Sequence, residues 1–198
     1  IPVACSYGHG TRLPGTLSLT PELLAAVARQ YAEWAATSGL TKVVFVNSHF
    51  GNAAALGIAT DHLRLFRPDL QAAVCNWWAV DAEVARQVAL DGDDVHANRA
   101  ETSLMLAVAP ALVDRERMAT ADDPDRTGDL VFRYTAPALS TNGVTGRPSE
   151  ATLELGEYLL DLTVGAIGGL VERARREKPP LGPAPVPSLH PYPPSLRP

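Results

Sequence analysis

The chain has few of the features that mark several large classes of protein. Its two cysteines, Cys5 and Cys75, match no metal-binding or disulfide spacing, so we expect buried core thiols and a reducing, cytoplasmic compartment. No basic cluster accompanies the net charge of −5, so nucleic acid is not an expected partner. No apolar run approaches the roughly 20 residues that span a bilayer, so no membrane partner is expected either. A 46% hydrophobic composition is typical of a globular protein.

Proline is unevenly spread, because nine of the 17 prolines lie in residues 179–198. Proline has no N–H and fixes φ, so this run cannot form a helix or a central strand. We therefore expect a folded domain at residues 1–177 and an extended or disordered tail at residues 178–198. The sequence opens on Ile1, within an apolar run and without Met, from which we expect that an N-terminal part of the domain is missing.

Between these ends, strand and helix patterns alternate. Continuous apolar runs at residues 42–46 and 71–78 predict buried strands. Residues 119–147 are expected to be mostly irregular, with a short strand at 130–132 as an option. The expected helices lie between Thr20 and Gly39, at 53–66, 82–90 and 99–108, and from Pro148 to Arg176. This alternation predicts the α/β class, with α/β/α layers around a mostly parallel sheet.

The first expected helix has clear terminal signals. Thr20 suits the N-cap, Pro21 the first turn and Gly39 the end. Apolar residues recur along it at helical spacing and are expected to form its buried stripe: Leu23, Leu24, Val27, Tyr31 and Trp34.

A polar loop, NSHFGN, directly follows the first buried strand. Ligands of open α/β sheets bind beyond the carboxyl ends of the strands, so this loop is well placed for a site. The imidazole of His49 can ligate a metal, and Gly51 lets the backbone approach a ligand. The residues themselves leave two interpretations about evenly open: a metal ligand, or a loop histidine held by hydrogen bonds beside the start of a helix.

A second polar segment, residues 93–103, leads into the helix at 99–108. His96 lies in its loop, and Glu101 lies in the first helical turn, where the helix dipole favours a carboxylate. Ordinary helix-terminal charge is the simpler explanation of Glu101. Two histidines and a glutamate in two such loops fit part of a metal-activated hydrolytic site, although this spacing is a weak signal and the chain has no HExxH, GxSxG or P-loop motif.

Four segments make the chain resemble the creatininase family of amidohydrolases. In order over about residues 1–170, they are SYGHGTRLPGTLSL, VVFVNSHFGN, HANRAETSLMLAVAP and GVTGRPSEATLELGE, of which the third is the most specific. The resemblance implies a layered α/β fold that commonly assembles as a homohexamer. It also implies a dinuclear site of zinc, or of zinc with manganese, whose bridging water attacks the amide-type carbon of a small-molecule substrate.

The resemblance also implies roles for single residues. His49 would be a metal ligand, and Glu101 a ligand or a carboxylate beside one. His96 would transfer a proton, either polarising the substrate or protonating the leaving nitrogen. Trp78 would line the substrate pocket. Phe50 and Ser48 depart from the commoner glycine-rich loop of the family, which should narrow the space over the metal, and Phe50 is a candidate substrate-binding residue.

The sequence departs from the family pattern in three respects. The early Glu-x-His segment and later Asp that supply three metal ligands in the family are not found in it. Creatininases carry a glutamate where this chain has Gly51 and a mobile tryptophan where it has Gly92, so creatinine itself is not the expected substrate. The leading hypothesis is a metal-dependent amidohydrolase acting on a small or cyclic amide. The alternatives are a short-peptide or formamide hydrolase, such as the mycofactocin-precursor peptidase, and a non-catalytic binding or assembly subunit.

Overall fold

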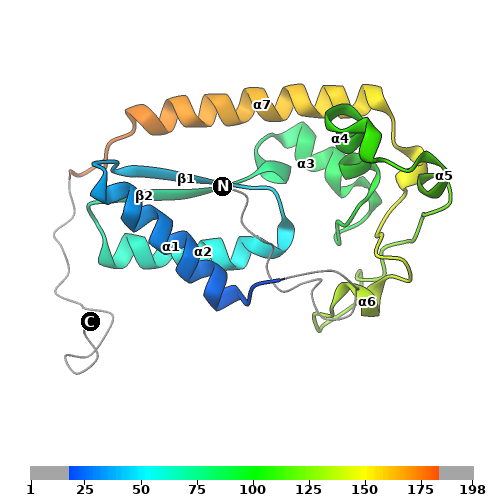
Figure 1. Cartoon of the computed structure of the whole chain (residues 1–198), viewed down its shortest axis with the longest axis horizontal. Coiled ribbons are helices and arrows are strands. Elements are labelled where there is room, and N and C mark those ends of the chain that lie inside the picture. The colour runs from blue at the N-terminus through cyan, green and yellow to red at the C-terminus, as the bar shows by residue number, and fades with distance from the viewer. Residues whose placement is uncertain (1–17, 183–198) are drawn as a thin grey trace. The chain divides into compact units, whose positions relative to one another are not determined.

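The computed structural model describes residues 18–182, which belong to two compact units (Figure 1). The first unit comprises Leu19–Asn76 and the chain from Leu170 onward, and the second comprises Trp77–Gly169. Of the expected tail, residues 178–182 form neither helix nor strand, and the remainder lies outside the described residues, as does Cys5. None of the helices described is both long enough and apolar enough to cross a bilayer.

The first unit is built on two parallel strands. Strand β1 (Lys42–Asn47) pairs with strand β2 (Gln71–Asn76) in register along their whole lengths. Helix α2 (Ala53–Phe66) connects the two strands, and helix α1 (Pro21–Thr37) packs beside it over the same face of the sheet (Figure 1). Parallel pairing through a helical crossover confirms the predicted α/β class.

Helix α1 begins and ends as predicted but buries a different face. The N–H of Leu23 donates to Oγ1 of Thr20 at 3.3 Å, which confirms the cap. Leu23, Tyr31 and Trp34, however, are 50%, 42% and 70% exposed. The predicted stripe is wrong for these three because small side chains let α1 lie close to α2, and helices approach according to the residues at their contact. The buried residues of α1 are Leu24, Ala25, Ala28 and Ala32.

Lys42, the first residue of β1, holds the end of the long helix α7 (Leu153–Arg176). Its Nζ donates to the carbonyl oxygens of Ala174, Arg175 and Glu177 at 2.7, 3.0 and 2.6 Å. Carbonyls at a helix C-terminus lack partners within the helix and carry the negative end of its dipole. The lysine therefore donates hydrogen bonds to the carbonyl oxygens at the C-terminal end of α7. That end belongs to the first unit, whereas α7 up to Gly169 belongs to the second.

The second unit is mostly helix and loop. Residues 130–132 do not form the optional strand, because no strand among the described residues of this unit pairs with them, and Val131 and Phe132 are 89% and 74% exposed. The strand predicted to reach residue 78 ends at Asn76, since Trp77 begins a 3-10 helix. Besides α7, the α-helices of this unit are α3 (Ala82–Val88), α4 (Arg99–Val108), α5 (Arg115–Met118) and α6 (Ala136–Leu139).

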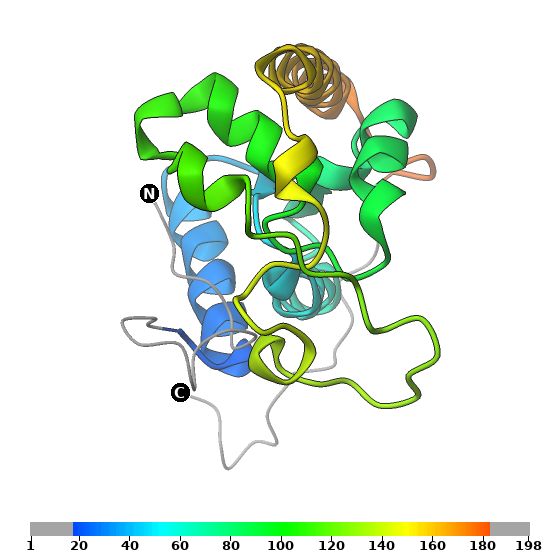
Figure 2. The ribbon, with the colours of Figure 1, turned by 90° about the vertical axis from the view of Figure 1, so that its right-hand side faces the viewer.

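Helices α4 and α7 meet at a glycine of α7. Figure 2 shows the two helices close to each other, α4 in green and α7 in yellow. A Cβ on Gly156 of α7 would lie 1.9 Å from the carbonyl oxygen of Ser103 in α4, which is too close for any side chain. Just ahead of α7, the N–H of Thr152 donates to Oγ of Ser103 at 3.1 Å. The position of α4, which carries Glu101, therefore depends on the absence of a side chain at Gly156.

We expect Gly156→Ala to lower the free energy of unfolding by about 1–3 kcal/mol, because the backbone of α4 has to move to admit a methyl group. Gly165→Ala is the matched control, since that position on the same helix has nothing within 4 Å of an added Cβ. There, alanine should raise stability by about 0.5–1 kcal/mol through its helix propensity. Urea unfolding of both variants measures the difference, and equal effects at the two positions would refute the close contact.

Candidate active site

The loop that carries His49 is fixed by asparagines at the ends of both strands. Asn47 is 2% exposed, and its Nδ2 donates to Oδ1 of Asn76 at 2.8 Å. Its own Oδ1 accepts the N–H of His49 at 3.1 Å. His49 and Phe50 are both half-buried, and Phe50 begins the 3-10 helix that leads into α2. Both residues therefore lie where the sequence predicts, at the carboxyl end of β1.

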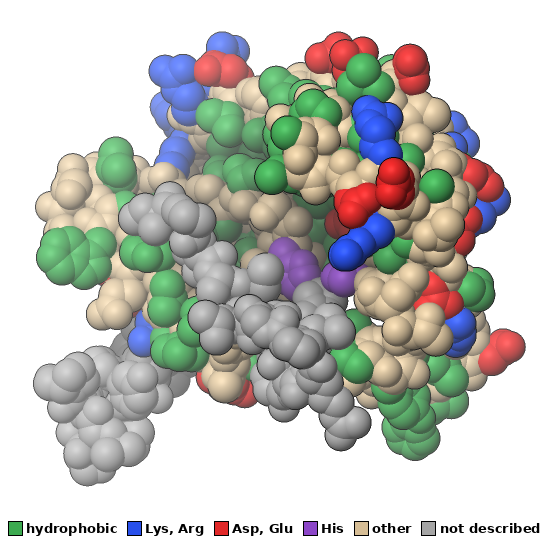
Figure 3. Space-filling view, turned by 45° about the vertical axis from the view of Figure 1, so that its right-hand side comes forward, with side chains coloured by type: hydrophobic (Ala, Val, Ile, Leu, Met, Phe, Trp, Pro, Cys, Tyr) green, Lys and Arg blue, Asp and Glu red, His purple; other side chains and the backbone are tan. Residues whose placement is uncertain are grey.

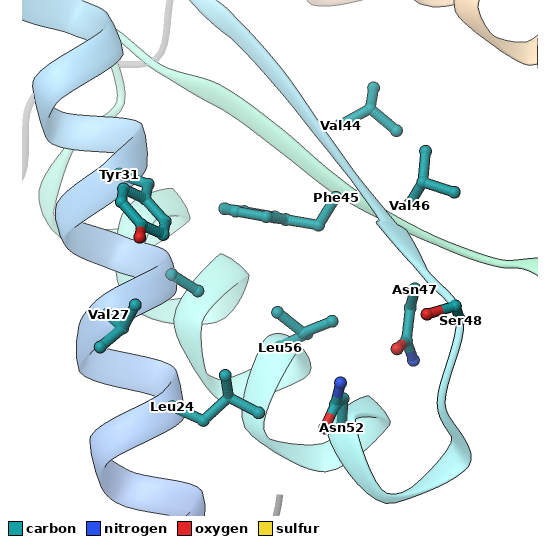
Figure 4. A pocket seen from close by; sticks show the side chains of 11 residues that line it. Leu24, Val27, Tyr31, Val44, Phe45, Val46, Asn47, Ser48, Asn52 and Leu56 are labelled. Atoms are coloured by element: carbon teal, nitrogen blue, oxygen red, sulfur yellow. The ribbon is translucent and has the colours of Figure 1, made fainter. Parts of the chain in front are cut away.

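A cavity of about 550 Å³ opens between α1, β1 and α2 at the same end of the first unit (Figure 4). Phe45 points from β1 toward α1, and Asn47, Ser48 and Asn52 gather at one end of the cavity. Most of the remaining lining is apolar, and its one ionisable side chain is that of Tyr31. A phenol does not exchange protons readily near neutral pH. His49 is not among the residues that line this cavity.

His96 lies in the loop between α3 and α4, and hydrogen bonds hold both its ring and its main chain. Its ring Nδ1 is hydrogen-bonded to the carbonyl oxygen of Gly143. Its main-chain carbonyl accepts the N–H of Thr145 at 2.8 Å, which forms an antiparallel bridge. The holding residues come from the segment expected to be irregular, so the sequence prediction missed them.

Glu101 lies in the first turn of α4, as predicted, and its carboxylate serves the backbone of the His96 loop. Oε2 accepts the N–H of Ala97 at 2.6 Å, while the N–H of Glu101 donates to Oδ1 of Asn98, the N-cap residue, at 3.0 Å. Ala97 has a φ of +51°, in the left-handed region that strains a residue with a Cβ. Glu101 therefore stabilises a strained peptide directly after His96. This role agrees with the simpler explanation from the sequence, in which Glu101 is an ordinary acidic residue at a helix N-terminus.

Two carboxyl groups near His96 are harder to ionise than usual. Burial raises the pKa of Glu101, and the hydrogen bond from Ala97 and the neighbouring His96 only partly oppose the rise. Burial also raises the pKa of Asp94, as does the negative charge of Asp125, while His96 acts in the opposite direction. Desolvated groups with charged neighbours are common in active sites, so this loop is the stronger of the two candidate regions.

Asp125 and Gly92 shape the loop before His96. Oδ2 of Asp125 accepts the N–H groups of Asp93 and Asp94 at 2.8 and 3.2 Å. Gly92 has a φ of +137°, and a Cβ there would lie 2.4 Å from the same oxygen. Any side chain at this position would displace Asp125, so this loop requires a glycine at position 92.

Asp123 anchors the segment that holds His96. It is 4% exposed, and its Oδ2 accepts Oγ of Ser140 at 3.0 Å and the N–H of Thr141 at 2.7 Å. Its main chain exchanges two hydrogen bonds with Gly146. The Arg126 guanidinium holds the pKa of the Asp123 carboxyl well below its usual range, and the bonds from Thr141 and Ser140 act in the same direction. A charged Asp123 thus stabilises both ends of residues 140–146.

The two tryptophans after β2 differ in exposure. Trp77 is buried, whereas Trp78 is half-buried, and their rings meet edge to face with centroids 6.5 Å apart. Both tryptophans belong to the 3-10 helix Trp77–Ala79 that follows the strand. The assignment of Trp78 to a substrate pocket stays a prediction.

Comparison with known proteins identifies the family. A family model for creatininase, described as creatinine amidohydrolase, matches residues 1–171. The chain belongs to the creatininase family. The membership and the fold inferred from the four sequence segments are therefore confirmed.

Two curated relatives of this creatininase-family chain act on different substrates, to judge from their names. It is 30% identical over 186 residues to the creatinine amidohydrolase of Pseudomonas putida, covering 87% of this chain and 70% of that protein. It is 28% identical over 186 residues to the mycofactocin precursor peptide peptidase of Mycolicibacterium smegmatis, covering 87% of this chain and 64% of that protein. The chain thus spans somewhat under two thirds of this peptidase.

A solved structure supports the fold. A mutant creatininase of the Zn-Zn type superimposes with a TM-score of 0.67 at 26% identity, covering 86% of this chain and 71% of that chain. The parallel strands and helical layers described above are therefore those of a creatininase fold.

The described residues of this family member do not by themselves make a metal centre. Within residues 18–182, no group of three or more His, Cys, Asp or Glu side chains is arranged to hold a metal ion. His49 and Glu101, the two predicted ligands, belong to different units. On the face shown in Figure 3, basic side chains gather at the upper left, whereas acidic and basic side chains lie among one another on the right.

We expect Asp123→Asn to destabilise the protein at pH 7, because asparagine cannot replace the charged acceptor beside Arg126. A carboxyl group with a lowered pKa stabilises the fold above its unfolded-state pKa of 3.8 and loses that contribution as the pH falls through its folded-state pKa. The difference in unfolding free energy between wild type and variant should therefore shrink below pH 3.8. Urea unfolding at pH 7 and pH 3 tests this, with the exposed Asp129→Asn as the control. A difference independent of pH would contradict it.

Proposed function

We propose that this chain is an amidohydrolase that cleaves the C–N bond of a small or cyclic amide, with His96 as its proton-transferring residue. The observation that carries the proposal is the double restraint on His96, at ring Nδ1 by Gly143 and at the main-chain carbonyl by Thr145. A half-buried imidazole fixed in this way is suited to a catalytic role rather than to packing alone. Membership of a hydrolase family supports the reaction class.

The proposed task of His96 follows from the chemistry of amides. The nitrogen of an amide is a poor leaving group until it is protonated, and an imidazolium held within hydrogen-bonding distance can deliver that proton. Positioned proton transfer of this kind contributes about 10²- to 10⁴-fold to a rate. Trp78, the half-buried member of the tryptophan pair, is proposed to contact the substrate, because an aromatic face suits a flat amide.

A divalent metal is part of the proposal on family grounds, since the matched creatininase is of the Zn-Zn type. His49 and Glu101 are the ligands proposed from this chain. His49 is supported by its fixed loop at the end of β1. Glu101 is supported by a half-buried carboxylate, of which one oxygen, Oε2, accepts the N–H of Ala97 and the other is Oε1. Because the described residues do not complete a metal centre, the proposed steps run through protein groups only.

A short peptide is the second candidate substrate. It is supported by the likeness to the mycofactocin precursor peptide peptidase and by two glycines, Gly51 and Gly92, at positions where creatininases carry larger side chains. The structure bears on the second of these, since Asp125 leaves no room for a side chain at Gly92. Creatinine is therefore the least favoured amide of the family.

We expect the purified full-length protein to hydrolyse at least one member of a panel of cyclic amides, N-formyl amines and short peptides. His96→Ala should reduce turnover by about 10²- to 10⁴-fold with unchanged metal content, because this residue moves a proton. His49→Ala should lower the content of zinc or manganese, measured by mass spectrometry of the protein.

His62→Gln controls for the loss of a histidine, since His62 packs between α1 and α2, where it contacts Arg29 and Phe66. Both the rate and the metal content of this variant should match those of wild type. If His96→Ala and His49→Ala both kept full rate and full metal, the assigned roles are wrong. A protein that binds metal but hydrolyses nothing on the panel would favour the binding-subunit alternative.

A further inference from the structure

Residues Ser140–Gly146 contact the His96 loop at three points within the second unit. The N–H of Thr145 donates to the carbonyl oxygen of His96 at 2.8 Å, and its Oγ1 donates to the carbonyl oxygen of Asp94 at 2.7 Å. The third contact joins the carbonyl oxygen of Gly143 to Nδ1 of His96. Thr145 is 1% exposed, so its hydroxyl is committed to this contact and shielded from water. One short segment thus fixes both the main chain and the ring of His96.

The turn that presents the Gly143 carbonyl is itself held by side chains. Oγ of Ser140 accepts the N–H of Gly143 at 2.9 Å, and Oδ1 of Asn142 accepts the N–H of Val144 at 3.0 Å. Nδ2 of Asn142 donates to the carbonyl oxygen of Ala121 at 2.8 Å. Gly143 has a φ of +89°, a conformation that glycine adopts without strain. The carbonyl is therefore aimed at His96 by a rigid turn.

The contact between Gly143 and His96 decides which ring nitrogen of neutral His96 carries the hydrogen. A carbonyl oxygen can only accept a hydrogen bond, so Nδ1 has to be the donor. Neutral His96 is then the Nδ1–H tautomer, whereas an unconstrained histidine in water favours Nε2–H. The proton that the imidazole gains or loses during a reaction consequently sits on Nε2.

We infer that Thr145 and Gly143 are positioning residues that hold His96 in the Nδ1–H tautomer with Nε2 as its proton-exchanging atom. Thr145 acts through its hydrogen bonds to the carbonyl oxygens of Asp94 and His96, whereas the carbonyl oxygen of Gly143 acts directly on the imidazole ring. Only the catalytic use of the Nε2 proton rests on the proposed function. The tautomer itself can be measured without any substrate.

Nitrogen NMR of protein labelled with ¹⁵N-histidine tests the tautomer, at a pH high enough to keep the histidines neutral and with His96→Gln to assign the signal. Wild type should show Nδ1 as the protonated nitrogen. Thr145→Val removes the hydroxyl without changing the size of the side chain and should shift His96 toward Nε2–H, whereas Thr145→Ser should retain Nδ1–H.

Thr163→Val is the matched control, a buried threonine in the same unit whose hydroxyl has no hydrogen-bond partner within the described structure. It should leave the His96 signal unchanged. Asn142→Ala, at an exposed position, loosens the turn and gives a second test should Thr145→Val fail to fold. It too should shift His96 toward Nε2–H.

Kinetics on whichever panel substrate is cleaved provide the functional test. Thr145→Val should lower kcat by about 10- to 100-fold with KM unchanged, since misplacing a catalytic group slows the reaction more than it weakens binding. Thr145→Ser should restore the rate. An Nε2–H signal in wild type, or a Thr145→Val variant with wild-type tautomer and kcat, would overturn the inference. An Nδ1–H signal that Thr145→Val shifts and Thr145→Ser retains supports it even if no substrate is cleaved, in which case the proposed function alone fails.

Discussion

Carboxylate side chains satisfy main-chain N–H groups throughout the loops around His96, and the rest of the second unit depends on them. Asp125 accepts two such groups before His96, Glu101 accepts one after it, and Asp123 accepts one in the segment opposite. A buried N–H without a partner costs about 1–3 kcal/mol, so loops without a sheet ladder need acceptors of this kind. Asp123 and Asp125 have lowered pKa values, and the negative charge of these two carboxylates strengthens their bonds to the irregular backbone.

This arrangement also explains why the loop before His96 contains a glycine at position 92. Gly92 is the residue that lets Asp125 reach the backbone of the His96 loop, so a larger side chain there is incompatible with the loop as it stands. Gly92 and Asp125 thus fix the backbone that leads to His96, whereas Gly143 and Thr145 hold His96 itself.

Local signals in the sequence predicted much of the fold. Thr20 and Pro21 mark the start of α1, the apolar run at 42–46 is a parallel strand, and Glu101 lies in the first turn of α4. These features depend on nearest neighbours along the chain, which is why they could be predicted. The burial of α1 could not, because whether Trp34 or Ala32 faces α2 depends on how closely two helices pack. Likewise, the strand expected to reach Trp78 stops at Asn76, where a 3-10 helix replaces it.

The sequence alone determined the family, the helices and strands of the α/β fold, and His49, His96 and Glu101 as candidate site residues. The tertiary structure decided what surrounds them. Thr145 and Gly143 are about 50 residues from His96 along the chain, in a segment with no periodic pattern, and no local rule connects them to it. Hydrogen bonds between distant loops depend on where the chain folds back, and that is set by the packing of whole elements, such as α4 against Gly156.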